Sequence, residues 1–399
     1  MTKYELLAPA GDLKRLKTAV DFGANAVFIG GKKFSLRYRA SNFGIEEIRE
    51  GAAYAHAHGA KLHVTANMIY HDSDLEGLKE YFVELEDAGV DAVIVASLYA
   101  VSLVKKYAPK LEAHLSTQLS TLNASSVAFL KRMGADRVVL GRETTLEEVD
   151  AIMKATDTPI EAFIHGAMCT NYSGRCTLSN YMTLRDANRG GCAQSCRWRY
   201  EVYNENKELV SDADNLMTMS SKDMRTVDVL DELLKTGVYS LKVEGRMKSE
   251  YYLACVISTY RNLIDAIERG DDIEEAKEIA NKKLLTAENR ESFPGFYTGT
   301  DISSEGYIYG RNGAVVNQDF LGVIKEVDGD NVIMQVRNHF STNEKIEIFG
   351  PNNFSQTFTL ESLVNSKGEN VDRVNRPMEL VTIKVPFNVS PADFVRRVS

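Results

Sequence analysis

Four clustered cysteines are the residues in this sequence best suited to chemistry. The chain has five cysteines in 399 residues, and four of them follow the spacing Cys169-x6-Cys176-x15-Cys192-x3-Cys196. Four thiolates suit either a structural zinc ion in tetrahedral geometry or an iron–sulfur cluster of the 4Fe-4S type. Zinc sites usually pair cysteines at short spacing, and only Cys192 and Cys196 meet that condition. The irregular spacing therefore favours iron–sulfur, with zinc as the alternative.

The segment around these cysteines is basic and aromatic, although the chain as a whole is acidic. The chain has 47 Lys and Arg against 56 Asp and Glu, a net charge of −9, so any contact with nucleic acid must be local. Between positions 175 and 200, one acid accompanies Tyr181, Trp198, Tyr200 and five arginines: Arg175, Arg185, Arg189, Arg197 and Arg199. Arginines with aromatic rings are typical of single-stranded nucleic-acid binding. Alternatively, the arginines offset the charge of the thiolates, and both interpretations are compatible.

The elements that must position these residues alternate between short β-rich runs and longer amphipathic segments. This alternation is typical of parallel βα units, and the number of repeats predicts a closed (β/α)8 TIM-like barrel. An open doubly wound sheet is the alternative, but the first turn lacks the glycine spacing of a phosphate-binding loop. The predicted strands are 4–8, 25–30, 61–66, 91–96, 111–115, 136–140, 160–165 and 239–243.

The cysteines lie in an insertion after the seventh strand, at about 166–235. Insertions at the carboxyl ends of barrel strands commonly build active sites. We expect a barrel domain over 1–287 and a linker over 288–317. A small antiparallel β-barrel is expected over 318–399, because short strand patterns recur at 322–327, 331–336, 345–348 and 380–385.

Polar side chains follow several predicted strands, where they would face the barrel mouth. Around the last strand, the period of two places Lys242, Glu244 and Arg246 on one face. Charges on a central barrel strand need partners or a ligand. One interpretation is a structural ion-pair network, and the other is an anionic ligand held by Arg142 and Arg246.

Several motifs resemble one known family. They read EAFIHGAMC at 161–169, GRCTLS at 174–179, ELLAPAGD at 5–12, STQ at 116–118 and LKVEGR at 241–246. These motifs resemble the collagenase-like "U" peptidase family (peptidase U32 type), and the resemblance covers nearly the whole chain. Members include bacterial enzymes that hydroxylate a tRNA wobble uridine or an rRNA cytidine, and others that hydroxylate the ubiquinone ring. In those members four cysteines hold a 4Fe-4S cluster, and the RNA enzymes are linked to prephenate.

The length and the single β domain are most similar to the tRNA enzyme, so the resemblance implies an iron–sulfur-dependent tRNA hydroxylase that forms 5-hydroxyuridine. It implies tRNA and a small anionic co-substrate, prephenate, as partners, and a 4Fe-4S cluster on Cys169, Cys176, Cys192 and Cys196. We predict catalytic roles for His165, Glu244 and Lys242. We predict substrate binding by Arg142, Gln118, Arg246, Arg197 and Arg199.

Other functions stay open at this stage. They are a collagenase-like peptidase, a hydroxylase of another RNA, and a non-catalytic subunit that binds RNA or a sister protein. The longest apolar run, at about 92–104, is too short to span a bilayer, and the first residues lack the pattern of a signal peptide. We therefore expect a cytoplasmic protein without a membrane anchor, as a homo-oligomer or a hetero-oligomer with a paralogue.

Overall fold

The computed structural model describes residues 3–36, 42–212, 216–287, 290–299, 306–308 and 319–398. Eight parallel strands close into a barrel, because β9 pairs with both β1 and β7. The predicted (β/α)8 barrel is thus confirmed. Its strands are β1 (Glu5–Pro9), β2 (Ala26–Gly30), β3 (Lys61–Ala66), β4 (Ala92–Val95), β5 (Glu112–Leu115), β6 (Arg137–Val139), β7 (Ile160–Ala167) and β9 (Ser240–Val243).

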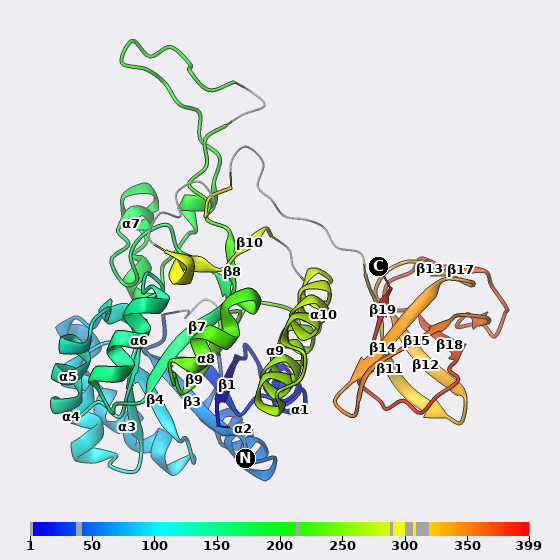
Figure 1. Cartoon of the computed structure of the whole chain (residues 1–399), viewed down its shortest axis with the longest axis horizontal. Coiled ribbons are helices and arrows are strands. Elements are labelled where there is room, and N and C mark those ends of the chain that lie inside the picture. Colours follow the sequence, from blue (N-terminus) through cyan, green and yellow to red (C-terminus); the bar gives the residue numbers. More distant parts are fainter. Residues whose placement is uncertain are drawn as a thin grey trace.

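Helices alternate with these strands and form the outer layer of the barrel (Figure 1). Their first turns are fixed by side chains that accept hydrogen bonds from backbone N–H groups, as Asp12 does from Arg15 at 2.8 Å and Ser249 from Tyr252 at 3.2 Å. The helices are α1 (Leu13–Asp21), α2 (Ile45–Ala57), α3 (Leu78–Asp87), α4 (Leu98–Tyr107), α5 (Ala124–Arg132), α6 (Leu146–Ala155), α8 (Leu230–Lys235), α9 (Glu250–Arg269) and α10 (Ile273–Leu285).

A buried ion-pair network lies inside the barrel. Arg137 contacts Glu5 at 2.5 Å and Glu161 at 3.1 Å, and Lys242 Nζ contacts Glu161 Oε1 at 2.7 Å. Two cations thus balance two carboxylates, and direct partners are what make buried charges tolerable. Lys242 therefore belongs to an ion-pair network, as the structural interpretation expects. The expectation that Lys242 faces the barrel mouth is wrong, because its ammonium group is buried against Glu161 and lies 4.4 Å from the centre of the Phe28 ring.

The insertion covers the carboxyl end of the barrel. It contains α7 (Leu178–Thr183) and an arm, described over 200–212 and 216–217, whose two sides meet where Tyr200 pairs with Met217. Figure 1 shows the arm extending away from the barrel. The chain then returns as β8 (Asp223–Arg225), which runs antiparallel to the end of β7, and β10 (Ser292–Phe293) pairs with β8. The end of β7 is thereby connected to the insertion through a small extension of the barrel sheet.

The described residues 319–398 form an antiparallel domain with a hydrophobic core of its own. Seven strands form a curved half-barrel in the order β15-β14-β19-β11-β12-β18-β16, which agrees with the predicted β fold. The predicted linker, 288–317, lies partly outside the described residues. The strands are β11 (Phe320–Asp328), β12 (Asn331–Val336), β14 (Lys345–Gly350), β15 (Asn353–Thr359), β16 (Leu363–Val364), β18 (Leu380–Lys384) and β19 (Phe394–Arg397), with β13 (Phe340–Ser341) and β17 (Arg373–Val374) as a separate pair.

The antiparallel domain packs against α1 and α9 of the barrel (Figure 1). Tyr251 stacks on Phe320 with ring centres 4.4 Å apart. Arg396 is 2% exposed, forms an ion pair with Glu347 at 2.7 Å and donates a hydrogen bond to Thr286 Oγ1 at 2.9 Å. This buried guanidinium has a partner in each domain and therefore fixes how the two domains pack together. None of the described helices is long and apolar enough to cross a membrane.

Candidate active site

Two glycines fix the insertion closely against the barrel loops. Gly166 has φ +107°, and a Cβ there would lie 2.3 Å from the carbonyl oxygen of Glu244. Gly174 has φ +73°, and its Cβ would lie 2.0 Å from the carbonyl oxygen of Gln118. Both positions therefore require glycine, for conformation and for space. These two glycines thus allow close contact between backbone segments.

Hydrogen bonds hold the two ends of the insertion together over the barrel mouth. Glu143, which follows β6, accepts from the backbone N–H of Ser173 at 2.8 Å. Thr170 Oγ1 donates to the carbonyl oxygen of Met219 at 2.6 Å, and Ser221 Oγ donates to that of Met168 at 2.9 Å. The segment that carries Cys169 and Cys176 is therefore anchored both to the barrel and to the returning chain.

The four cysteines are placed at the surface of the insertion. Cys169 and Cys192 are exposed, Cys176 and Cys196 are partly buried, and the Asn171 amide lies 3.2 Å from Cys176 Sγ. Burial raises the pKa of the Cys196 thiol, and the nearby thiols of Cys169 and Cys192 raise it further. Three thiols thus interact electrostatically, and thiolates are the ligands that an iron–sulfur cluster takes. In the part of the chain that the structure describes, no three His, Cys, Asp or Glu side chains converge on one metal position.

The predicted arginines divide into those that hold the insertion and those that face solvent. Arg197 donates to the carbonyl oxygen of Met168 and Arg185 to that of Cys192, both at 3.5 Å, and Arg189 forms an ion pair with Asp74 at 2.5 Å. Arg199 is exposed. The aromatic side chains beside them are also exposed: Trp198 by 45%, Tyr172 by 59% and Tyr181 by 85%. The surface of the insertion therefore offers flat rings and a cation to a partner.

The predicted substrate-binding residues of the barrel lie at strand ends, as expected. Arg142 follows β6 and stacks over the Phe163 ring at 3.8 Å. Arg246 is 5% exposed and donates to Ser35 Oγ at 3.3 Å. Gln118 follows β5, and its buried Oε1 accepts no hydrogen bond from the described residues. Because β9 ends at Val243, the predicted common strand face for Lys242, Glu244 and Arg246 does not exist.

His165 does not face the barrel mouth, contrary to our expectation. A bulge in β7 changes the alternation of side chains, because Phe163 pairs with Lys242 whereas His165 pairs with Val243. His165 therefore points outward to α9, where its Nδ1 lies 3.3 Å from the Tyr260 hydroxyl. Burial, reinforced by Lys248 and Arg225, lowers the pKa of His165 to about 3. The imidazole is neutral at physiological pH and is only 3% exposed.

Sequence reasoning missed Asp223 and Lys248. Asp223 begins β8, is 8% exposed, and interacts electrostatically with Lys248, Arg142, Arg197 and Glu244. The sequence around Asp223 contains no motif that marks it, since its burial results from the pairing of β8 with β7 and β10. The charged residues of the barrel mouth thus include a carboxylate that the pattern of strand ends does not reveal.

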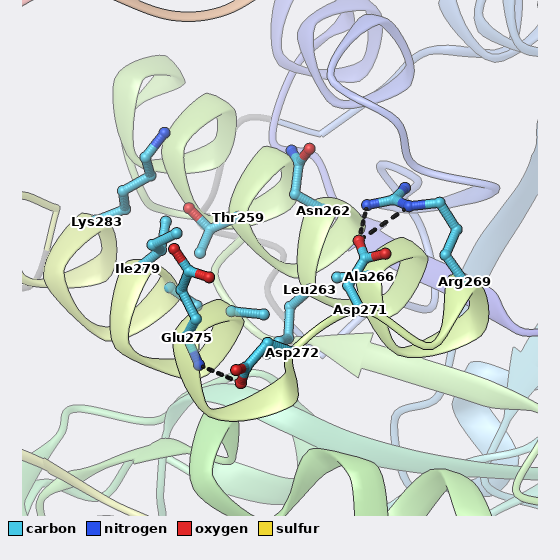
Figure 2. A pocket seen from close by; sticks show the side chains of 12 residues that line it. Thr259, Asn262, Leu263, Ala266, Arg269, Asp271, Asp272, Glu275, Ile279 and Lys283 are labelled. Carbon is cyan, nitrogen blue, oxygen red and sulfur yellow. Dashed lines mark hydrogen bonds and ion pairs between the residues drawn. The ribbon is translucent and has the colours of Figure 1, made fainter.

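A surface pocket of about 400 Å³ lies away from this site, between α9 and α10. Figure 2 shows its charged rim, where Arg269 binds Asp271 and where Asp272 accepts a hydrogen bond from the Glu275 backbone. No residue predicted for catalysis, substrate binding or metal binding lines this pocket. The candidate site is therefore the barrel mouth and the insertion above it.

A barrel with a cysteine-rich and arginine-rich insertion over its mouth defines the class of this protein as a TIM-barrel enzyme. The model of peptidase family U32 matches residues 11–305, and that of the family's C-terminal domain matches 316–396. The chain belongs to peptidase family U32.

Three relatives illustrate the range of the family. Over 99% of this chain and 95% of the relative, the chain is 41% identical to "tRNA hydroxylation protein P1" of Bacillus subtilis. It is 33% identical to "tRNA hydroxylation protein P" of Escherichia coli, over 92% of this chain and 91% of the relative. It is also 41% identical to "23S rRNA 5-hydroxycytidine C2501 synthase" of E. coli, over 67% of this chain and 41% of that protein.

Proposed function

We propose that this enzyme hydroxylates RNA, and specifically that it forms 5-hydroxyuridine at the wobble position of tRNA. The observation that carries the proposal is the insertion over the barrel mouth, which joins four thiols to exposed rings and arginines. Two relatives that match more than nine-tenths of this chain have names that refer to tRNA hydroxylation, and these names support the same substrate class. The proposed setting is the cytoplasm, where tRNA is available.

The four cysteines would hold a 4Fe-4S cluster. Such a cluster supplies the electron transfer that hydroxylation of a pyrimidine carbon requires and that side chains do not provide. The chain itself contributes the Asn171 amide at 3.2 Å from Cys176 Sγ, a contact that stabilises a thiolate. It also contributes the hydrogen bonds of Thr170 and Ser221, which keep the two ends of the insertion together.

RNA binding is assigned to the exposed side of the insertion. Trp198 and Tyr181 present ring faces on which unpaired bases can stack, and Arg199 presents a guanidinium for phosphate. An anticodon loop suits such a surface, because its bases are single-stranded and reach a barrel mouth with little unpairing cost. The acidic net charge elsewhere confines the contact to this region.

Binding of prephenate is assigned to Arg142, which follows β6, and to Arg246, which follows β9. Phe163 holds the Arg142 guanidinium flat, and Ser35 orients that of Arg246, so both are suited to carboxylate binding. Proton transfer is assigned to Glu244. His165 faces α9 and Lys242 is engaged by Glu161, so neither has access to the mouth.

The experiment compares tRNA from a strain that lacks this gene with tRNA from the same strain carrying the wild-type chain. We expect nucleoside mass spectrometry to show loss of 5-hydroxyuridine in the deletion strain, recovery with wild type, and no recovery with Cys176→Ser. Cys255→Ser is the matched control, because Cys255 is buried in α9 outside the insertion. Iron and sulfide content of anaerobically purified protein reports the cluster directly. Unchanged 5-hydroxyuridine after deletion would contradict the proposed substrate.

The family name raises a second function, hydrolysis of protein. The same purified preparations are therefore assayed on gelatin with and without iron. Hydrolysis that persists after iron removal, in a strain with unchanged 5-hydroxyuridine, would favour the peptidase. Gel filtration of wild type alone and with a paralogous chain tests the expected oligomer.

A further inference from the structure

Asp223 is a buried carboxylate whose Oδ1 atom has no hydrogen-bond donor among the described residues. Its side chain is 8% exposed, and Oδ1 accepts no hydrogen bond from the described residues. Its closest cation is Arg290, at an ion-pair distance of 3.8 Å, which is too long for a hydrogen bond. A carboxylate removed from water in this way is expensive for the fold, and native structures seldom leave one without donors.

The surroundings of Asp223 are positively charged. Lys248 precedes α9, Arg142 follows β6 and Arg197 lies in the insertion, and each of these cations favours the ionised carboxylate. Glu244, at the end of β9, opposes them, and burial is the largest effect and raises the pKa of Asp223. Four separate parts of the chain thus bring charge to one buried carboxylate. A structural ion pair would instead show direct contacts, as the Glu161–Lys242 pair does at 2.7 Å.

A buried acceptor atom that no described donor reaches, with cations around it, complements the chemistry of a nucleotide. A nucleotide offers O–H donors on its ribose and N–H donors on its base, and its phosphate binds cations. Lys248 is partly exposed, and its ammonium group lies 4.8 Å from the centre of the Tyr252 ring. The pairing of β8 with β7 and β10 holds Asp223 rigidly beside the mouth, so the acceptor is preorganised.

We propose that Asp223 binds the target nucleotide of the RNA by accepting a hydrogen bond from it, while Lys248 binds the adjacent phosphate. The shared chemistry is an O–H or N–H donor, from the ribose or the base respectively. This proposal rests on the proposed function, because it requires RNA at the barrel mouth. It adds a binding residue that neither the strand-end pattern nor the cysteine motif contains.

The effect of removing Asp223 on stability distinguishes a binding residue from a structural one. Asp223→Ala removes a buried charge whose Oδ1 has no donor in the described part of the chain, so we expect the melting temperature to stay unchanged or to rise. A structural carboxylate would lower it on removal. Stability gained together with binding lost is the behaviour of a residue retained for function.

The experiment measures binding of an anticodon stem-loop by fluorescence anisotropy at fixed salt. Asp223→Ala should weaken binding of the unmodified RNA by about tenfold, the effect of one charge-assisted hydrogen bond. Two further RNAs carry 2′-deoxyuridine or 3-methyluridine at the target position, which remove the O–H or the N–H donor. One of these two RNAs should bind wild type about tenfold more weakly than the unmodified RNA does. The same RNA should bind Asp223→Ala as tightly as the unmodified RNA does. The RNA that does so identifies the donor.

Glu291→Gln is the matched control, because Glu291 precedes β10 beside Asp223 but its side chain is 56% exposed and contacts Lys222 at 3.3 Å. We expect it to change affinity by less than about twofold. Equal affinity of Asp223→Ala and wild type for the unmodified RNA overturns the proposal. A marked fall in the melting temperature of Asp223→Ala also overturns it. So does an equal loss of affinity in wild type and in Asp223→Ala with each modified RNA. If wild type does not bind the unmodified stem-loop, the proposed function fails first and this inference fails with it.

Discussion

Replacing Lys242 tests whether this residue is structural, as the geometry indicates. Lys242 Nζ lies 2.7 Å from Glu161 Oε1, and the side chains are 7% and 0% exposed. The Lys242→Met variant keeps most of the side-chain volume and removes the charge. Among the described residues, the cation that then remains in contact with Glu161 is Arg137, at 3.1 Å, and Arg137 is already engaged by Glu5. In the variant, the carboxylate of Glu161 therefore stays in the barrel interior with one of its two cations removed.

The magnitude follows from the pKa of Glu161. Burial opposes ionisation, but Lys242 first and Arg137 second lower the pKa of Glu161 from 4.5 to about 2. A pKa lowered from 4.5 to about 2 corresponds to about 3 kcal/mol of folding free energy at neutral pH. Because the folded pKa lies below the unfolded one, this stability is present above about pH 4.5 and is lost as the pH falls towards 2. Breaking a buried pair typically costs about 3 to 5 kcal/mol, which agrees.

The assay is urea unfolding followed by circular dichroism, at neutral pH and at about pH 3. We expect Lys242→Met to lose about 3 kcal/mol at neutral pH and clearly less in acid, where the buried Glu161 of the variant, without Lys242, takes up a proton. Adding Glu161→Gln to Lys242→Met should recover part of the loss, since no unpaired charge then remains. The control is Lys154→Met, because Lys154 is 74% exposed and its pair with Asp150 should contribute less than about 1 kcal/mol.

One result would refute this reasoning. The free energy of unfolding of Lys242→Met could lie within about 0.5 kcal/mol of that of wild type at both pH values while tRNA modification is abolished. In that case the ion pair does not explain why the chain has Lys242 at this position. Lys242 would then act directly on the substrate. A loss of stability that does not depend on pH would also contradict the assigned role of Glu161.

Three further predictions follow from other contacts. Gly166→Ala should prevent soluble expression or sharply lower the melting temperature, because its Cβ would lie 2.3 Å from the Glu244 carbonyl oxygen. Arg396→Met should destabilise the protein by about 3 kcal/mol in urea unfolding, since it leaves Glu347 buried without its 2.7 Å partner. Trp198→Ala should weaken RNA binding by about 1 to 3 kcal/mol in anisotropy, with the melting temperature unchanged because the ring is 45% exposed.

The barrel was predictable from the sequence because its signals are local. Strands with consecutive apolar residues, helices with a 3.6-residue period, and capping residues such as Asp12 and Ser249 each act within a few positions. The same holds for the cysteine cluster, whose spacing is read directly from the chain. The antiparallel domain was also predictable, through β11, β12, β14 and β18, whereas β15, β19 and the short β13, β16 and β17 were not predicted.

The positions of individual side chains in the site depended on contacts between distant segments. The sequence shows His165 at a strand end, but a bulge between Phe163 and His165 decides that the imidazole faces α9. It shows Lys242 near the mouth, but Glu161, 81 positions away, binds it inside the barrel.

The sequence by itself determined which chemical groups this protein has and how far apart they lie along the chain. These are the four thiols, the arginines of the insertion and the eight βα repeats. Only the tertiary structure decided which charged groups lost water and which faced one another, and Asp223 is the clearest case. The physical reason is that the burial of a side chain depends on which strands pair around it, and here β7, β8 and β10 come from segments far apart in the sequence.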